Sequence, residues 1–323
     1  MRPSRRTFLQ RAGGAAALGG LARAANAQPY PARPVRIVVG FSPGITPDIT
    51  ARLMGQWLSE RLGQPFIVEN RPGAGSNIAT EAVARAAPDG YTLLLVTLAN
   101  AVNATLYGNL SFDFIRDIAP VASILHVPLV MEVHPSVPAT TVAEFIAYAR
   151  SHPGRINMAS GGDGSPQHVA GELFRMMTGI DMPHVAYRGN PLPDLIAGEV
   201  QVYFGPLPGS IGYIRAGKLR ALAVTSTTRS AALPDLPIVG DFVPGYEASS
   251  WYGIGAPRGT PESLVEKLNR EVNAALADPG VRGRLAELGA EPLPMKPAAF
   301  GQLIAEETGK WGRVVRFVSI RLD

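Results

Sequence analysis

Two short segments combine glycine, a hydroxyl side chain and proline at a point where a predicted strand gives way to a predicted helix. They are Pro43–Asp48 and Gly162–Pro166. Glycine lets backbone N–H groups approach a ligand closely, and the first turn of a helix has unpaired N–H groups and a partial positive charge. Such junctions bind carboxylates as well as phosphates. Either segment alone would suit a merely well-capped helix, but two in different halves of one chain favour a binding site for an anion.

The elements around the first junction follow from hydrophobic patterning. The apolar run Val35–Val39 predicts a buried strand, and Thr46 and Pro47 predict the N-cap and first position of the next helix. Residues 66–70 predict a second strand and residues 91–97 a third, with a helix between them. Strands that alternate with helices at this spacing form parallel βαβ units.

The second junction lies in a similar series. Thr141 and Glu144 predict a capping box for a helix that ends near Ser151, and Ser165 predicts the N-cap of a later helix. Strands are predicted over residues 155–159, 184–187, 200–204, 219–225 and 251–256. The remainder, from Pro261 to about residue 318, is predicted to be largely helical.

The turn Gly73–Asn77 resembles part of a dinucleotide-binding fingerprint. It follows the second predicted strand, and no third glycine stands at the required position. We therefore interpret this turn as a loop that lines a cleft, not as a nucleotide site.

The sequence gives little support for a catalytic site or for a metal site. Ser165 and His168 are three residues apart on one helical turn, but no acid is evidently placed to orient His168, and no Gly-x-Ser-x-Gly elbow occurs. The five histidines fall singly, without the spacing of metal ligands, and there is no cysteine. We expect a protein that is not an enzyme and that needs no cofactor or metal.

The first 27 residues have the pattern of an export signal. Arg5 and Arg6 precede Phe8-Leu9, a weakly apolar Ala/Gly stretch follows, and Ala25-Asn26-Ala27 forms a small-x-small cleavage site. The paired arginines favour the twin-arginine route over the general secretory route, and the apolar stretch is far too short to span a membrane. We expect cleavage after Ala27 and a periplasmic location.

The leader also accounts for the basic charge of the chain. It holds five of the 30 basic residues and no acid, which leaves 25 basic against 26 acidic residues and a net charge of about −1. No basic run interleaved with aromatics follows, so we expect no nucleic-acid partner. About 296 residues after the leader favour two domains. Without cysteine there is no disulfide or lipid-modified N-terminus, and we expect a diffusible monomer.

Beyond these patterns, the chain resembles the Bug family, the TctC-like extracytoplasmic receptors of tripartite tricarboxylate transporters. The resemblance runs in order through nearly the whole chain after the leader, and its most specific part is Val68–Gly75. The other matching segments are Val39–Gly44 with Asp48, Ala51 and Arg52; Pro88–Leu93; Ala101–Asn103 with Leu106 and Tyr107; Gly171–Phe174; Tyr187–Gly189; Ala216–Thr225; and Trp251–Gly253 with Ala256, Pro257, Thr260 and Pro261.

This resemblance implies a type II periplasmic-binding-protein fold, in which two α/β domains are joined by two crossing strands and a ligand cleft lies between them. Residues 127–133 and 250–256 fit the crossings. Domain one would comprise residues 28–127 and 253–323, and domain two residues 128–252.

The resemblance also implies a small organic carboxylate, held between the first loop of domain one and the Gly/Ser loop of domain two. Family members bind di- and tricarboxylates, amino acids, aromatic acids or nicotinate-type acids. The residues expected to bind the ligand are Phe41, Ser42, Gly44, Ile45, Thr46, Asp48, Ala74, Gly75, Leu98 and Asn100 in domain one, and Ser160, Gly162, Gly164, Ser165, His168, Arg188 and Gly205 in domain two.

Three positions depart from the family pattern. Ile45 replaces a usual glycine and narrows the entrance against a bulky or highly charged ligand. Gly205 and Pro206 stand where many members have Asp or Asn, which argues weakly against an amino acid ligand. Asn100 stands where a histidine is frequent.

The sequence does not decide which membrane protein is the partner of the ligand-bound form. We expect delivery of the ligand to the membrane permease subunits of a tripartite tricarboxylate transporter. Signalling to a membrane sensor would use the same site. A periplasmic serine hydrolase using Ser165 and His168 is the alternative from another class.

Overall fold

The computed structural model of this protein describes residues 30–187 and 189–319. The predicted leader and cleavage site therefore lie outside the described residues. Within those ranges, no helix is both long enough and apolar enough to cross a membrane.

One α/β unit is built from three parallel strands. Strand β1 (Val35–Val39) lies between β2 (Phe66–Asn70) and β3 (Thr92–Thr97), with Val35 opposite Phe66 and Arg36 opposite Thr92. The connecting helices are α2 (Thr46–Leu62), α3 (Asn77–Ala84), which follows the short turn η1 (Ala74–Ser76), and α4 (Leu98–Leu106). The predicted strands and βαβ connections are confirmed here, because short, mainly apolar runs bounded by glycine or proline favour strands of a parallel sheet.

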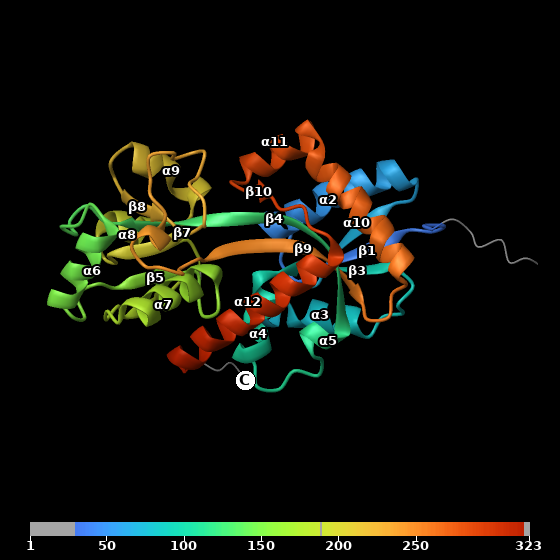
Figure 1. The fold of residues 1–323 in the computed structure, drawn as a ribbon, viewed down its shortest axis with the longest axis horizontal. Helices are drawn as coiled ribbons and strands as arrows, with labels where there is room; N and C mark the ends of the chain where they lie inside the picture. Colours follow the sequence, from blue (N-terminus) through green and yellow to red (C-terminus); the bar gives the residue numbers. More distant parts are fainter. Residues whose placement is uncertain (1–29, 188, 320–323) are drawn as a thin grey trace, which may run out of the picture.

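A second α/β unit occupies the other end of the molecule (Figure 1). Strand β5 (Met158–Ser160) pairs in parallel with β6 (His184–Ala186) and β7 (Val202–Pro206), and β8 (Arg220–Val224) lies nearby on β4. Its helices are α6 (Val142–Ser151), α7 (Pro166–Thr178), α8 (Leu192–Ala197) and α9 (Leu207–Arg215), and the turn η2 (Val239–Asp241) follows β8.

Two long strands run between the units. Strand β4 (Ile118–Val133), which follows the short helix α5 (Phe114–Asp117), pairs with β9 (Ser249–Pro257) up to Pro128 and with β7 and β8 from Leu129 onward. Beyond β4, β9 also pairs with β3. The continuous sheet therefore consists of two units that are joined by β4 and β9. This is the arrangement of a type II periplasmic-binding fold.

Thr225 ties the two crossings together at the boundary between the units. The Leu129 N–H donates to its hydroxyl oxygen at 2.9 Å, and the hydroxyl donates to the Ala248 carbonyl at 2.7 Å. All three residues are buried, so these bonds fix where the chain leaves one unit and enters the other.

The last part of the chain returns to the first unit. Helices α10 (Glu262–Ala277) and α11 (Pro279–Glu287) and the short strand β10 (Glu291–Pro292) pack there, as predicted for a largely helical end. The final helix α12 (Pro297–Val318) lies along α4 and β4 and reaches α7 of the second unit (Figure 1). The chain end thus spans the boundary between the units.

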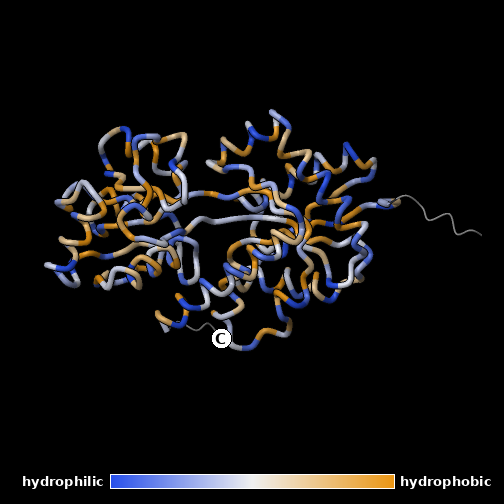
Figure 2. The backbone as a smooth tube through the Cα atoms, in the orientation of Figure 1, coloured by the Kyte–Doolittle hydropathy of each residue, from blue (hydrophilic) through white to orange (hydrophobic). Residues whose placement is uncertain are grey.

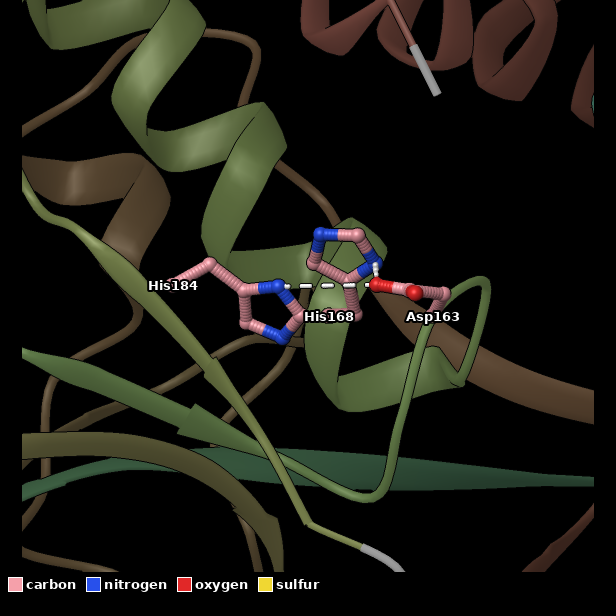
Figure 3. Close-up of side chains that lie close together, drawn as sticks. All are labelled: Asp163, His168 and His184. Atoms are coloured by element: carbon pink, nitrogen blue, oxygen red, sulfur yellow. Dashed lines mark ion pairs between the residues drawn. The ribbon is translucent and has the colours of Figure 1, made fainter. Parts of the chain in front are cut away.

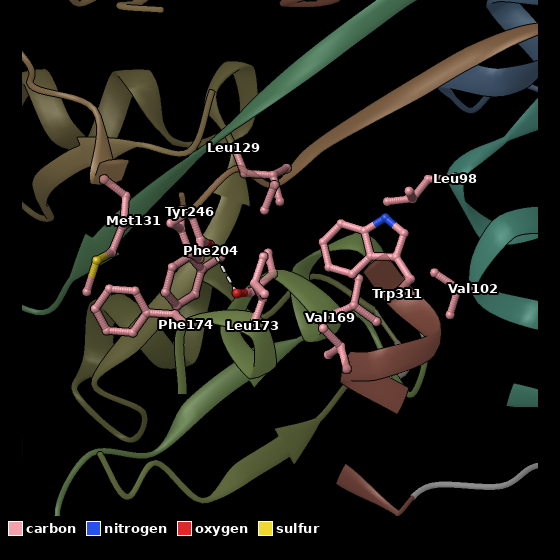
Figure 4. Close-up of a cluster of buried hydrophobic side chains, with 14 of the residues drawn as sticks. Leu98, Val102, Leu129, Met131, Val169, Leu173, Phe174, Phe204, Tyr246 and Trp311 are labelled. Atoms are coloured by element: carbon pink, nitrogen blue, oxygen red, sulfur yellow. Dashed lines mark hydrogen bonds between the residues drawn. The ribbon is translucent and has the colours of Figure 1, made fainter. Parts of the chain in front are cut away.

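The hydrophobic core continues across this boundary. Figure 4 shows Trp311 of α12 between Leu98 and Val102 of α4 on one side and Val169 of α7 on the other, and its side chain is fully buried. Burial of each large apolar side chain contributes about 1.5–3 kcal/mol. In Figure 2 the hydrophobic segments gather along the inner strands, and hydrophilic ones lie mainly on outer helices and loops.

One helix start differs from its prediction. Thr46 was expected to be the N-cap of α2, but the N-cap is Ile45, and Thr46 is already helical. The reason is that Asp48 reaches back from the first turn and accepts a hydrogen bond from the Gly44 N–H, so the turn is closed without a capping hydroxyl. The predicted N-caps Thr141 and Ser165 are confirmed, since each accepts a hydrogen bond from the N–H three residues on.

Candidate functional site

A cavity of about 390 Å³ lies between the two units. It is at the carboxyl ends of β1, β3 and β5, where open α/β sheets bind ligands. Its walls come from both units and from β9. The lining residues are Phe41, Ile45, Thr46, Pro47, Gly75, Thr97, Ala99, Asn103, Leu106, Tyr107, Asp163, Gly164, Ser165, Pro166, Gln167, Ser250 and Tyr252.

The start of α2 forms one wall. Asp48, only 2% exposed, accepts hydrogen bonds from the Gly44 N–H, Arg52 Nε and Asn70 Nδ2 at 2.8–2.9 Å. Burial alone would raise the pKa of Asp48, but these three donors outweigh it and hold the pKa below its ordinary value. The carboxylate therefore stays charged and is neutralised by Arg52, so the helix end at Thr46 keeps its attraction for an anion.

A strained turn supports the same wall. Ala74, Gly75 and Ser76 all have left-handed backbones, with φ of 45°, 60° and 83°. Such a conformation costs about 1–3 kcal/mol for a residue other than glycine and persists only where the surroundings enforce it. Here Asn103 Nδ2 donates to the Gly75 carbonyl at 2.7 Å. A Cβ on Gly40 would lie 2.0 Å from Ser76 Oγ, so glycine is required there.

The start of α4 is fixed by a capping box. Asn100 accepts a hydrogen bond from the Thr97 N–H at 2.8 Å, and its amide donates to Thr80 Oγ1 at 2.8 Å. Asn100 is 2% exposed and lies behind the wall. Its role in this geometry is to position Thr97, which faces the cavity.

The opposite wall is the loop before α7. Ser165 Oγ accepts the His168 N–H at 3.3 Å, and the Gly164 N–H donates to His168 Nδ1 at 3.1 Å. The hydrogen of the Ser165 hydroxyl remains available to a ligand because the oxygen acts as acceptor in the cap. The two helix starts thus meet the cavity from both units.

A cluster of two histidines and an acid stands beside this wall (Figure 3). The rings of His168 and His184 are stacked, with centroids 3.8 Å apart and planes inclined by 10°. Asp163 Oδ1 lies 4.0 Å from His168 Nδ1 and 3.7 Å from His184 Nδ1, beyond hydrogen-bonding reach. Strands β5 and β6 bring these residues together, which spacing along the chain did not reveal.

Both imidazoles are neutral near pH 7. Burial is the main reason that the pKa of His168 is lowered to about 3, and electrostatic repulsion from the neighbouring His184 and Arg175 adds to it. Burial also lowers the pKa of His184 below its ordinary value, although Asp163 opposes the shift. The carboxylate of Asp163 is therefore not balanced by a charged histidine.

These three side chains are the group within the described ranges that could ligate a metal ion. In the present geometry His168 Nδ1 is occupied by the Gly164 N–H, and parallel rings direct their lone pairs side by side and not toward one point. For a metal ion to bind, the hydrogen bond from Gly164 to His168 would have to break and the two rings would have to turn out of their stacked arrangement.

The arrangement does not favour the hydrolase alternative. A catalytic dyad needs Ser165 Oγ bonded to an imidazole nitrogen, but Ser165 Oγ is bonded to the backbone N–H of His168. The His168 ring is 2% exposed, and the acids near it, Asp163 and Glu172, are 3.8 Å or more from its nitrogens.

The residues predicted to bind the ligand fall into three groups. Six line the cavity: Phe41, Ile45, Thr46, Gly75, Gly164 and Ser165. Ser42, Gly44, Ala74 and Gly162 lie in the same loops without lining it. The buried residues that do not line it are Asp48, Leu98, Asn100, Ser160, His168 and Gly205. Arg188 lies outside the described residues.

Other lining residues were not among the predicted ones. Tyr252 and Ser250 come from the crossing strand β9, and Leu106 and Tyr107 from the end of α4. Leu106, Tyr107 and Tyr252 belong to the motifs that resemble the Bug family, so the resemblance could have identified them as lining residues. Gln167 and Asp163 had none beyond their position beside Ser165.

Comparisons with known proteins agree with this architecture. The family model described as "Tripartite tricarboxylate transporter family receptor" matches residues 50–320. Protein BugT of Bordetella pertussis is 36% identical over 311 residues, 95% of each chain. Two solved structures are also similar. "R. palustris Rpa4515 with adipate" is 38% identical and covers 90% of this chain and 99% of its own, with a TM-score of 0.76. "MatC (Rpa3494) from Rhodopseudomonas palustris with bound malate" is 34% identical and covers 88% and 100%, with a TM-score of 0.73.

Proposed function

The chain belongs to the tripartite tricarboxylate transporter receptor family, and we propose that it is a periplasmic solute-binding protein that captures a small organic carboxylate in the cavity between its two units. Members of this family are extracytoplasmic solute-binding receptors. The relatives solved with adipate and with malate support a carboxylate as the ligand class.

The observation that carries this proposal is the meeting of two helix starts at one cavity. Thr46 at the start of α2 and Ser165 at the start of α7 both line it, from opposite units. Each start offers unpaired N–H groups, a hydroxyl and the positive end of a helix. This combination recognises a carboxylate without a lysine or arginine.

The magnitudes explain why both walls are needed. One helix end contributes about 0.3–1 kcal/mol to anion binding when exposed and up to about 2 kcal/mol when partly buried. A micromolar ligand requires about 8 kcal/mol. Closure of the second unit over the ligand excludes water and adds the second helix end, several hydroxyls and the apolar surfaces of Phe41 and Tyr252.

The residues that hold the ligand follow from the same geometry. We infer that Phe41, Ile45, Thr46 and Gly75 contact it from domain one, residues 28–127 with 253–323. Gly164 and Ser165 contact it from domain two, residues 128–252.

The proposal also covers export and partner. We infer that the leader directs export through the twin-arginine route and is cleaved after Ala27, and that the monomeric protein delivers its ligand to permease subunits. In the signalling alternative, a membrane sensor would bind the same ligand-closed form. Genes for permease subunits beside this one would favour transport over signalling.

Isothermal titration with mono-, di- and tricarboxylates tests the proposal, on protein unfolded and refolded to strip bound ligand. We expect at least one acid to bind and Ser165→Ala to weaken it about tenfold. Thr141→Ala is the matched control, because Thr141 is also an N-cap but lies at α6, away from the cavity. Loss of either cap costs about 1 kcal/mol of stability. Absence of binding heat with every acid would refute the proposal.

A further inference from the structure

Strand β9 separates two cavities. Its side chains Ser250 and Tyr252 line the cavity between the two helix starts, here called the ligand cavity. Their neighbours Ser249 and Trp251 line a second cavity, of about 230 Å³. Successive side chains of a β-strand point to opposite faces of the sheet. The second cavity therefore lies on the other face of this crossing strand, behind the ligand cavity.

The second cavity, which we call the hinge cavity, has walls from both units. Ser226 and Thr227 come from the loop after β8 of the second unit, whereas Leu303 comes from α12, which packs on the first unit. The crossing strands contribute Trp251 of β9 and His126 of β4. The hinge cavity thus spans the boundary between the units, as the ligand cavity does, but on the opposite face of β9.

Helix α12 is attached to the crossing strand beside the hinge cavity. Glu307 Oε2 accepts a hydrogen bond from Trp251 Nε1 at 3.1 Å. Lys310 Nζ lies 2.7 Å from Oε2 of Glu247, in the segment just before β9. Both acids line the hinge cavity. Because these contacts hold α12 against β9, the loop after β8 is the wall that moves when the units rotate.

Rotation of the units about β4 and β9 changes the two cavities in opposite senses. In the described structure the units touch at the edge of the ligand cavity, where Leu106 lies against Gly164. A movement that parts Thr46 from Ser165 on one face of β9 brings the loop after β8 toward α12 on the other face. An opened ligand cavity therefore goes with a narrowed hinge cavity, and close-packed protein interiors resist even small compression.

We propose that the hinge cavity controls the balance between the open and closed forms: a group that fills it blocks opening and so tightens ligand binding on the opposite face of β9. The inference rests on the proposed function and adds a means of regulating it. When only the closed form binds, the affinity is reduced in proportion to the closed fraction of the ligand-free protein. A filled hinge cavity raises that fraction, so affinity rises without any new contact to the ligand.

Two tryptophan substitutions, one on each wall, fill the hinge cavity. Thr227 is exposed at its edge and Leu303 is half-buried on α12. The cavity has many times the volume that one water molecule needs, so an added indole ring fits. We expect Thr227→Trp and Leu303→Trp each to tighten binding by about threefold to tenfold. Thr228→Trp is the matched control, because Thr228 is exposed beside Thr227 but does not line the cavity.

Two measurements test the inference on the full mature chain, refolded to remove bound ligand. Calorimetry gives the affinity for the acid that the wild type binds most tightly, from a panel that includes adipate and malate. Small-angle X-ray scattering on the ligand-free proteins needs no ligand, and both cavity-filling variants should have a smaller radius of gyration than the wild type. Thr228→Trp should match the wild type in both measurements. Thr227→Trp changes a surface loop, so it keeps the test valid if Leu303→Trp does not fold.

The outcomes separate this inference from the proposed function. If the wild type binds an acid, folded Thr227→Trp must show both tighter binding and a smaller radius of gyration. Absence of either change, or equal tightening by Thr228→Trp, would overturn control by the hinge cavity while leaving carboxylate capture intact. If no acid binds but the filled variants are still more compact, the proposed function fails and control of opening by the hinge cavity stands.

Discussion

Leu106 in α4 lies directly against Gly164 in the loop before α7, so the two units touch at the edge of the cavity. A Cβ on Gly164 would stand 2.5 Å from Leu106 Cδ2, and Gly164 has a left-handed backbone with φ of 72°. We predict that Gly164→Ala hinders the closed arrangement and weakens ligand binding more than tenfold, measured by titration calorimetry.

Two further variants separate the clash from the backbone strain. Gly179→Ala introduces the same side chain at φ of 68°, where no atom lies within 4 Å, and should cost about 1 kcal/mol of stability without changing affinity. Leu106→Ala combined with Gly164→Ala should restore part of the affinity. Equal affinity losses in Gly164→Ala and Gly179→Ala would show that contact between the units is not the cause.

Asp48 holds the loop that forms the first wall. We predict that Asp48→Ala lowers the free energy of unfolding by about 2–3 kcal/mol, because it removes the buried carboxylate that accepts hydrogen bonds from the Gly44 N–H, Arg52 and the Asn70 amide. Ligand affinity should fall as well. Urea unfolding measures the first effect, with Asp89→Ala as the control. Asp89 pairs with Arg33 on the surface, where such pairs contribute under about 1 kcal/mol. Similar losses in both variants would contradict the prediction.

Adjacent acids on α12 give a sharp comparison. Glu307 accepts hydrogen bonds from the indole N–H groups of Trp251 and Trp311 and pairs with Lys310. Glu306 is exposed, and among the described residues its one side-chain hydrogen bond is from Gln302. We predict that Glu307→Ala costs about 3–5 kcal/mol in urea unfolding, as expected when a buried pair loses one partner. Glu306→Ala should cost less than about 0.5 kcal/mol. A small effect at both positions would mean that Glu307 is not a structural anchor.

Glu132 predicts a pH dependence of stability. It is fully buried in β4, and burial raises its pKa to about 8, although the hydrogen bond from Ser210 opposes the shift. A carboxyl whose pKa is higher in the folded than in the unfolded chain stabilises below the unfolded value of 4.5, and this contribution is lost as pH rises toward 8. The advantage of Glu132→Gln over wild type should therefore grow by about 3 kcal/mol between pH 5 and pH 8. The exposed Glu199→Gln should show no such growth, and parallel curves for Glu132→Gln and wild type would contradict the shift.

Local sequence patterns predicted the elements that depend on local forces. Val35–Val39 and Phe66–Asn70 are mainly apolar at their centres and have clear breakers on either side, and their predicted limits match the strands. Ser165 is followed by a proline and a helix-forming run, and it caps α7 as expected. Thr46 looked equivalent to it. The difference came from Asp48, whose side chain closes the turn through Gly44.

The candidate site depends more on distant contacts. Asp163, His168 and His184 meet because β5 and β6 pair, and no spacing rule along the chain encodes that pairing. Tyr252 reaches the cavity because β9 lies between β3 and β4. Strand β4 was foreseen only over residues 127–133, from the resemblance, since Pro120, His126 and Pro128 interrupt its apolar pattern, yet it begins at Ile118. These features follow from pairing across the whole fold.

The place of β9 has a consequence for how the protein is made. Strand β3 cannot complete its pairing until residues 249–257 exist, and the core of the first unit also needs α10 and α12 from the end of the chain. During synthesis, the β3 edge of the sheet formed by β1, β2 and β3 therefore stays unpaired until about 150 further residues have been made. Contacts so distant in sequence make folding slow, because long loops must close before they are stabilised. The chain should finish folding only after it has left the ribosome, and until then its unpaired β3 edge is open to chaperones or to aggregation.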